Sequence, residues 1–218
     1  MNQTVAQAGT KERILDASER LFAEHGFEAT SLRAITTEAG VNLAAVNYHF
    51  QSKDALINAV IGRRIGPVNR RRLEMLDEIE AHAGAGPLPV GPVIEAFIRP
   101  VLEIPRTGAR HFRPMVGRVF TEPEEFVARF FKEHLAHVAD RFFAAFRRAQ
   151  PSLPEPELLW RAHFLIGAMA HTMTGNRLLE HVSKGLCDTN DVDSMVDRFV
   201  HVFTAVFQLP LTEAPHAH

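Results

Sequence analysis

The 218-residue sequence has a single cysteine, Cys187, so no disulfide can form within the chain. This excludes the disulfide framework that stabilises many small secreted domains. The N-terminus has no apolar stretch of the kind found in signal peptides, and no apolar run reaches the roughly 20 residues that a membrane helix needs. We therefore expect a cytoplasmic protein without a membrane-spanning segment.

The short motifs of many enzymes are missing as well. The sequence has no Gly-rich phosphate loop and no serine elbow, and Cys187 lies in a polar stretch without groups that would activate it. Two pairs of histidines have helical spacing, His134 with His137 and His163 with His171, but neither pair is joined by the further ligands of a zinc site. We expect no enzyme, no metal and no cofactor, and keep a helical metal-binding protein or enzyme as the weakest alternative.

An excess of basic residues is also lacking. The chain has a formal charge of -2, and residues 1–60 hold five Lys or Arg against seven Asp or Glu, again -2. Nucleic-acid-binding domains are more often basic overall. Most of these seven acids nevertheless fall within one predicted helix, residues 10–25, so the overall charge neither requires nor excludes a nucleic-acid partner.

Apolar residues recur at three- and four-residue steps throughout, without the alternation typical of strands, so we expect an all-α fold. Thr10 is the predicted N-cap of the helix over 10–25, and Gly26 is its stop. A second helix is expected after Thr30 and Ser31. Further helices are expected at 53–79, 93–103, 108–121, 123–149, 155–182 and 189–208.

The most informative stretch is residues 41–53, which hold the only tyrosine, Tyr48. Gly40 ends the second helix, and a turn of about four residues leads to a short third helix near 43–50. Val46 and Phe50 are four residues apart and can anchor this helix to the core. This spacing is typical of a helix-turn-helix, in which the second helix of the pair lies in the major groove of DNA.

The other side chains of the third helix would then share its outer surface. Asn47 can bond to adenine, and small apolar groups such as Ala44 and Ala45 can contact a thymine methyl. Tyr48 and His49 are better suited to phosphates. Ser52 is the predicted cap of the next helix, whose start suits another phosphate.

Residues 11–60 closely resemble the DNA-binding domain of TetR-family transcriptional regulators. The resemblance rests on Thr30–Ile35, Ala39-Gly40-Val41 and Asn47–Phe50 followed by Lys53. It implies phosphate contacts from Thr30 or Ser31, Tyr48, His49 and Lys53, and base contacts from Arg33, Leu43, Ala44, Ala45 and Asn47. It also implies a transcriptional regulator that binds double-stranded DNA, usually as a repressor.

We divide the chain into a flexible arm at 1–9, a three-helix helix-turn-helix domain at 10–56, a larger helical ligand-binding and dimerisation domain at 57–208, and a disordered tail at 209–218. Gly66-Pro67 should kink or interrupt the helix that links the domains. Local sequence leaves open whether this is a signalling hinge or a plain break.

Thirteen of the 16 phenylalanines lie from residue 93 onward, which favours a large core, an apolar cavity, or both. We expect an apolar pocket lined by long side chains, with polar anchors for a ligand head group. The predicted apolar lining is Phe97, Phe112, Met115, Val119, Phe120, Phe126, Phe130, Trp160, Phe164, Met169 and Met173. The candidate anchors are Arg99, Arg118, His163, His171 and Asn176.

The last two predicted helices combine apolar side chains on more than one face with small residues such as Gly167. This pattern favours a homodimer through a four-helix interface, which would present two recognition helices to a palindromic site. Residues 156–175 together with 41–50 are similar to the fatty-acid-responsive PsrA-type subgroup, which implies a fatty acid or acyl-CoA as ligand. A DNA-binding scaffold without a small-molecule response is the main alternative.

Overall fold

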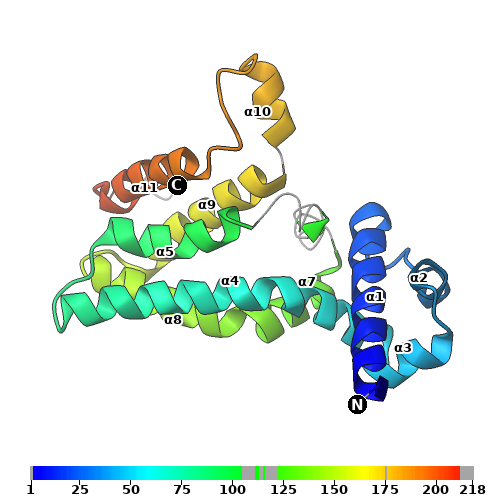
Figure 1. The fold of residues 1–218 in the computed structure, drawn as a ribbon. Coiled ribbons are helices and arrows are strands. Elements are labelled where there is room, and N and C mark those ends of the chain that lie inside the picture. The colour runs from blue at the N-terminus through cyan, green and yellow to red at the C-terminus, as the bar shows by residue number, and fades with distance from the viewer. Residues whose placement is uncertain (1, 105–110, 113–114, 116–121, 175, 212–218) are drawn as a thin grey trace, which may run out of the picture. The chain divides into compact units, whose positions relative to one another are not determined.

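The computed structural model describes residues 2–104, 111–112, 115, 122–174 and 176–211. Every regular element in this part of the chain is a helix, which confirms the predicted all-α fold (Figure 1). The elements are α1 (Asn2–His25), α2 (Leu32–Ala39), α3 (Leu43–Phe50), α4 (Lys53–Ala83), α5 (Val90–Leu102), α7 (Glu124–Phe130), the π-helical turn η1 (Phe131–Leu135), α8 (Ala136–Ala149), α9 (Glu155–Thr174), α10 (Asn176–Val182) and α11 (Val192–Gln208).

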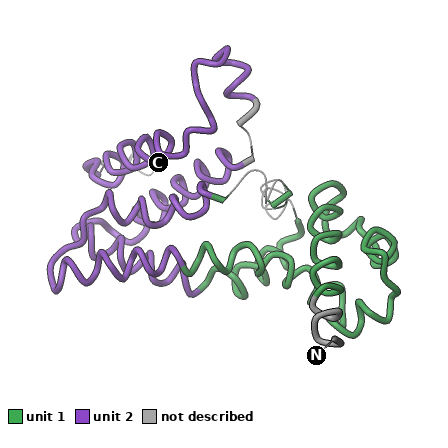
Figure 2. Tube along the Cα trace, viewed as in Figure 1, with its two compact units in different colours: residues 1–70, 104–136 green, residues 71–103, 137–218 purple. Residues whose placement is uncertain are grey.

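The chain forms two compact units, coloured separately in Figure 2. Unit 1 comprises residues 1–70 and 104–136, and unit 2 comprises residues 71–103 and 137–218. Residues 104–136 therefore pack with the N-terminal part of the chain, although the sequence suggested a single domain over 57–208. The predicted division into a DNA-binding domain and a ligand-binding domain stays a prediction, because the two compact units have other boundaries.

The N-terminal head of unit 1 is a small three-helix core, as the apolar spacing predicted. Ile14 and Phe22 from α1 are fully buried, as is Ile35 from α2. Val46 and Phe50 complete this core from α3. The spacing of four residues between Val46 and Phe50 thus anchors α3, as expected.

The helix ends of the head follow from single residues. Ser31 caps α2, with its hydroxyl accepting a hydrogen bond from the backbone N–H of Ala34 at 3.1 Å. Gly40 ends α2 in the left-handed conformation, with φ of 62°. The Ser52 hydroxyl accepts from the N–H of Ala55 at 3.0 Å, as predicted for the start of α4.

The start of α1 and the continuity of α4 differ from the prediction. The first helix begins at Asn2, so Thr10 lies inside α1 and its hydroxyl accepts a hydrogen bond from Arg13 at 3.5 Å instead of capping the helix. No proline precedes Thr10, and Ala6 and Ala8 favour helix, so nothing forces a later start. Pro67 lies within α4 and does not interrupt it.

The helices predicted for the second half are found with small changes. The segment predicted as one helix at 123–149 contains the π-helical turn η1, and the segment predicted at 155–182 is divided into α9 and α10. Residues 108–121 fall largely outside the described residues. Residues 150–154, which include Pro151 and Pro154, and residues 183–191 separate the helices on either side of them.

In unit 2, α5 packs closely on α11. A β-carbon on Gly91 would lie 3.3 Å from both Thr204 Oγ1 and Val200 Cγ1, which is tighter than most such contacts, so glycine suits this close approach. The guanidinium of Arg161, on α9, is buried and donates to the carbonyls of Val206, Phe207 and Leu209 at the end of α11. Arg161 thus fixes α9 against α11.

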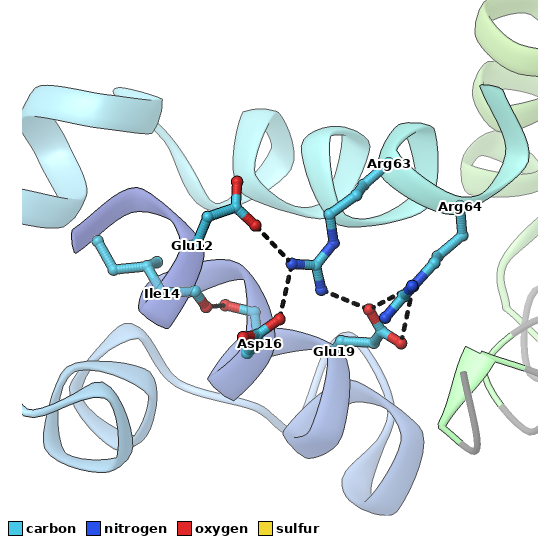
Figure 3. A network of polar contacts seen from close by, with 7 residues as sticks. Glu12, Ile14, Asp16, Glu19, Arg63 and Arg64 are labelled. Atoms are coloured by element: carbon cyan, nitrogen blue, oxygen red, sulfur yellow. Dashed lines mark hydrogen bonds and ion pairs between the residues drawn. The ribbon is translucent and has the colours of Figure 1, made fainter. Parts of the chain in front are cut away.

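A polar network joins α1 to the first half of α4 within unit 1 (Figure 3). Arg63 lies 2.5 Å from Glu19, 2.7 Å from Asp16 and 3.1 Å from Glu12, and Arg64 lies 3.0 Å from Glu19. Burial acts to lower the pKa of Arg63, but its hydrogen bonds to Glu19 and Asp16 outweigh burial and raise that pKa above the ordinary value. Glu19 is the centre of the network because its side chain is only 4% exposed.

We predict that Glu19→Gln lowers the free energy of unfolding by about 2 kcal/mol, because it leaves two guanidinium groups without their buried carboxylate. Glu12→Gln is the matched control: Glu12 contacts the same Arg63 but its side chain is 60% exposed, so the loss should stay below about 1 kcal/mol. Denaturant unfolding measures both. Equal losses would contradict the central place of Glu19.

Candidate nucleic-acid interface

The recognition helix α3 presents the face that the sequence predicted. Tyr48 is 71% exposed and Leu43 is 49% exposed, and Ala44 and Asn47 are also exposed. Ala45 and His49 are half-buried. This face follows directly from the burial of the two anchoring side chains, because α3 has only one rotation that hides both of them.

Both ends of α3 are held by groups that the sequence analysis did not single out. Asn42 is the N-cap, and its side-chain oxygen accepts from the N–H of Ala45 at 2.9 Å. An asparagine directly before an apolar helical run is a signal for such a cap. Beyond α3, Gln51 has a φ of 64° and a ψ of -40°, and the N–H of Ser52 donates to the carbonyl of Phe50 at 2.7 Å. This γ-turn joins α3 to α4 through only two residues.

The two hydroxyl residues before α2 have different positions. Thr30 is buried and its hydroxyl donates to the carbonyls of Gly26 and Leu21, at 2.7 and 3.2 Å. Thr30 therefore holds the α1–α2 turn and cannot reach a phosphate without leaving it. Ser31 is exposed, so of the two predicted alternatives only Ser31 remains a candidate.

The remaining predicted contacts are arranged around α3. Arg33 is exposed on α2. Lys53, at the start of α4, donates from Nζ to the carbonyl of Glu28 at 2.9 Å, so its ammonium group already supports the α1–α2 turn. The rings of Tyr48 and His49 lie edge to face with centroids 5.1 Å apart. The Tyr48 ring is thus oriented by a neighbour while its hydroxyl end stays on the surface.

Ion pairs offset much of the negative charge of the head. Besides the three acids of the Arg63 and Arg64 network, Glu38 lies 2.5 Å from Arg20 and Asp54 lies 3.3 Å from Arg129. Five of the seven acids of residues 1–60 are therefore paired with arginine. None of these five belongs to α3, so the recognition face carries no carboxylate.

The predicted ligand residues are divided between the two units. Phe112, Met115 and Phe130 are buried in unit 1, whereas Met169 and Met173 are buried in unit 2. Phe97 is half-buried in unit 2, and Phe126 is half-buried in unit 1. Arg118, Val119, Phe120 and the side chain of Asn176 lie outside the described residues.

Several predicted pocket residues face solvent instead. Trp160 and Phe164 are 58% and 56% exposed, stack with centroids 5.8 Å apart, and lie beside the exposed His163. His171 is exposed too. Helical spacing alone does not say which face of α9 is turned inward, and here the Leu158, Arg161 and Leu165 face is buried.

The candidate anchor Arg99 is engaged at the surface by carboxylates. It lies 2.6 Å from Asp193, 2.7 Å from Glu95 and 3.4 Å from Glu103. The hydrogen bond to Asp193 is the main cause that raises the pKa of Arg99 above its ordinary value. Arg99 is therefore a structural link between α5 and α11 in this structure.

A buried cation lies instead at Arg72, which the sequence analysis did not identify. Its guanidinium is 4.4 Å from the Phe97 ring, donates to the Phe97 carbonyl at 2.7 Å and contacts the Met169 sulfur at 3.6 Å. Burial lowers the pKa of Arg72 to about 10, so the group stays charged at neutral pH. Arg72 thus places a positive charge beside two of the predicted apolar ligand residues.

Among the described residues, no helix is both long and apolar enough to cross a bilayer. The same part of the chain contains no cluster of three or more histidine, cysteine or acidic side chains that could hold a metal ion.

A three-helix head with α2 and α3 in helix-turn-helix arrangement, and with α3 exposing a neutral polar and apolar face, defines an all-α DNA-binding protein. Residues 14–60 match the family model of the bacterial regulatory proteins of the tetR family, and residues 95–205 match the model of the tetracyclin repressor-like C-terminal domain. The chain belongs to the TetR family of transcriptional regulators.

Named transcriptional regulators match a part of the chain. The chain is 42% identical over 59 residues to the transcriptional regulator UidR of Escherichia coli (strain K12), a match that covers 27% of this chain and 30% of UidR. It is 32% identical over 60 residues to the transcriptional repressor KstR2 of Rhodococcus jostii (strain RHA1), covering 28% of this chain and 29% of KstR2. The matched segments thus span less than a third of these relatives.

Solved structures show the same fold over nearly the whole chain. The SmeT–triclosan complex has a TM-score of 0.60 at 20% identity, covering 94% of this chain and 99% of that one. The fatty acid degradation regulator FadR from Bacillus halodurans has a TM-score of 0.58 at 13% identity, covering 91% and 99%.

The interface predicts different roles for two neighbouring residues. Asn47→Ala should relax preference at particular base pairs, by about 1–3 kcal/mol of discrimination. Tyr48→Ala should instead weaken binding to all duplexes alike, since a phosphate contact sets position rather than sequence. Titration of each variant against operator fragments with single base-pair changes measures both effects. Uniform weakening by Asn47→Ala would contradict its assignment.

Proposed function

We propose that this protein is a cytoplasmic, dimeric repressor that binds a palindromic operator through α3 and releases it when a small apolar ligand binds. The observation that carries the proposal is the exposed face of α3, which is oriented by the burial of Val46 and Phe50. In this proposal Arg33, Leu43, Ala44, Ala45 and Asn47 contact bases, and Ser31, Tyr48, His49 and Lys53 contact phosphates.

The homodimer is proposed from the distribution of exposed apolar side chains in unit 2. Ten of the 13 large exposed apolar residues in the described chain lie between Leu159 and Leu211. Monomeric proteins rarely leave so much apolar surface open in one region. Trp160 and Phe164 on α9 and Val202 on α11 would be covered by the same helices of a second copy, in a two-fold interface.

Two-fold symmetry fixes the kind of DNA that such a dimer reads. The two α3 helices would enter successive major grooves, with half-sites about one helical turn, ~34 Å, apart or a multiple of it. Because few basic residues lie in the head, we expect a modest number of phosphate contacts from each subunit. Affinity should still fall as salt rises.

A small apolar ligand is supported by the nature of the side chains in both units, and the similar SmeT structure holds triclosan. Phe97 and Met169 lie beside the charged Arg72, a pairing that would suit an amphiphile with an acidic head. A fatty acid or acyl-CoA as the ligand stays a prediction, and so does membership of the PsrA-type subgroup. A role of Gly66-Pro67 as a signalling hinge is likewise a proposal, in which α4 bends without breaking.

The function is tested by fluorescence anisotropy of the full-length protein with the promoter region of its own operon. We expect salt-dependent binding to a palindromic fragment and tenfold or greater weakening on adding a ligand from a panel of fatty acids, acyl-CoAs and neutral apolar compounds. Such a shift requires about 1.4 kcal/mol of differential affinity between the two states. Binding that no compound weakens would favour the DNA-binding scaffold, and absence of DNA binding would contradict the whole proposal.

The dimer is tested by placing a charge in its proposed interface. Phe164→Asp should yield a monomer in sedimentation equilibrium and lower operator affinity sharply, because the two heads would then bind independently. Phe131→Asp is the matched control, since Phe131 is 46% exposed and lies in unit 1, outside the group of exposed apolar residues that supports the dimer. A Phe164→Asp protein that stays dimeric would place the interface elsewhere.

A further inference from the structure

Helix α7 is attached to the DNA-binding head by an aromatic stack within unit 1. The rings of Phe126 and Phe27 are stacked with centroids 5.0 Å apart and an interplanar angle of 27°. Phe27 is buried in the turn after α1, and its ring centroid lies 5.3 Å from that of Phe22 in the head core. An aromatic row therefore runs from the head core into α7, although Phe126 was predicted to line a ligand pocket.

The same face of α7 reaches the start of α4. Arg129 lies 3.3 Å from Asp54, and its guanidinium is 5.8 Å from the Phe126 ring. Beside Asp54, Lys53 bonds to the carbonyl of Glu28 in the α1–α2 turn. The turn before α2 and the first residues of α4 are thus held together at one place, with α7 packed on both.

The α1–α2 turn and the start of α4 lie at the two ends of residues 31–53, which hold the proposed DNA contacts. The α1–α2 turn leads directly to Ser31, and α4 follows α3 after only Gln51 and Ser52. A shift of α7 would therefore disturb both ends of residues 31–53. The ion pair is exposed and adds little energy by itself, so the stack supplies most of the attachment.

Beyond α7, η1 provides a second attachment to α4. The side chain of Asn69 donates to the carbonyl of His134 at 2.8 Å. A β-carbon on Gly62 would lie 3.5 Å from His134 Cε1, which is ordinary packing distance. The segment 124–135 is consequently anchored along α4 as well as on the head, which makes it a stiff support rather than a loose loop.

We propose that Phe126 and Arg129 are positioning residues for operator binding: α7 holds the head in the orientation that binds DNA, and loss of the Phe126 stack or of the Arg129 ion pair lowers DNA affinity without removing any contact to DNA. The inference rests on the proposed function, because it presupposes DNA binding by the head. Its physical basis is preorganisation, since a head that is already oriented loses less freedom on binding.

The test uses full-length Phe126→Ala and Phe126→Leu, the second of which keeps apolar volume and removes only the stack. Both should bind the operator fragment about threefold to tenfold more weakly. The slope of log affinity against log salt should stay that of the wild type, because no phosphate contact is lost. Phe131→Ala is the control: Phe131 is 46% exposed, on the adjoining turn, and its loss should leave affinity unchanged.

The ion pair between Arg129 and Asp54 is tested by exchanging the two charges. Arg129→Asp should weaken operator binding, and adding Asp54→Arg should restore it at least in part. A decrease of the salt slope by about one in Arg129→Ala would show a direct phosphate contact and overturn the positioning role. Failure of the exchange to restore any affinity would also overturn it.

The outcomes separate this inference from the proposed function. If the folded wild type binds no operator fragment, the proposed function fails. If the wild type binds and the Phe126 variants bind as tightly, or weaken no more than Phe131→Ala, the positioning role of α7 fails alone.

Discussion

Burial of Val46 and Phe50 in the core of the head sets the rotation of α3, and the DNA-binding surface depends on that rotation. With both side chains turned inward, Asn47 and Tyr48 have no alternative but to face outward. The caps on either side then fix where α3 begins and ends. Recognition by this protein is thus a consequence of core packing, which an apolar pair four residues apart already determines.

The ion pairs of the head offset its net negative charge. Arginines of α4 and α1 take up carboxylates that would otherwise repel DNA, and Glu19 is buried between two of them. The pairs of Arg63 and Arg64 with Glu19 also attach α1 to α4. The same side chains therefore offset the charge and attach the helices, so a substitution that alters one of these effects also alters the other.

Local patterns predicted α2 and α3 well because both helices are short and each has one buried face. Ser31, Gly40 and Ser52 act as the sequence indicated. The sequence could not distinguish Thr30 from Ser31, since adjacent hydroxyl residues are equally able to cap a helix, and only the packed turn shows that Thr30 is buried. The pairing of Glu19 with Arg63 and Arg64 depends on tertiary packing and leaves no local signal.

The second half was harder for a different reason. Long helices such as α9 carry apolar residues on more than one face, so spacing does not say which of Trp160, Phe164 and Met169 is buried. The stack of Phe126 on Phe27 joins residues far apart in the chain, and a pocket prediction based on composition could not anticipate it. Arg72 was missed because it is the last of three consecutive arginines, Arg70 to Arg72, and arginines on a charged helix usually lie on the surface.

The central claim is that residues 31–53 form the DNA-binding surface. Amide hydrogen exchange of the full-length protein, measured by mass spectrometry with and without operator DNA, tests it most directly. We predict that protection on binding is concentrated in α2, α3 and the first turn of α4. Protection concentrated in other described helices, with none in α3, would contradict this account of the protein.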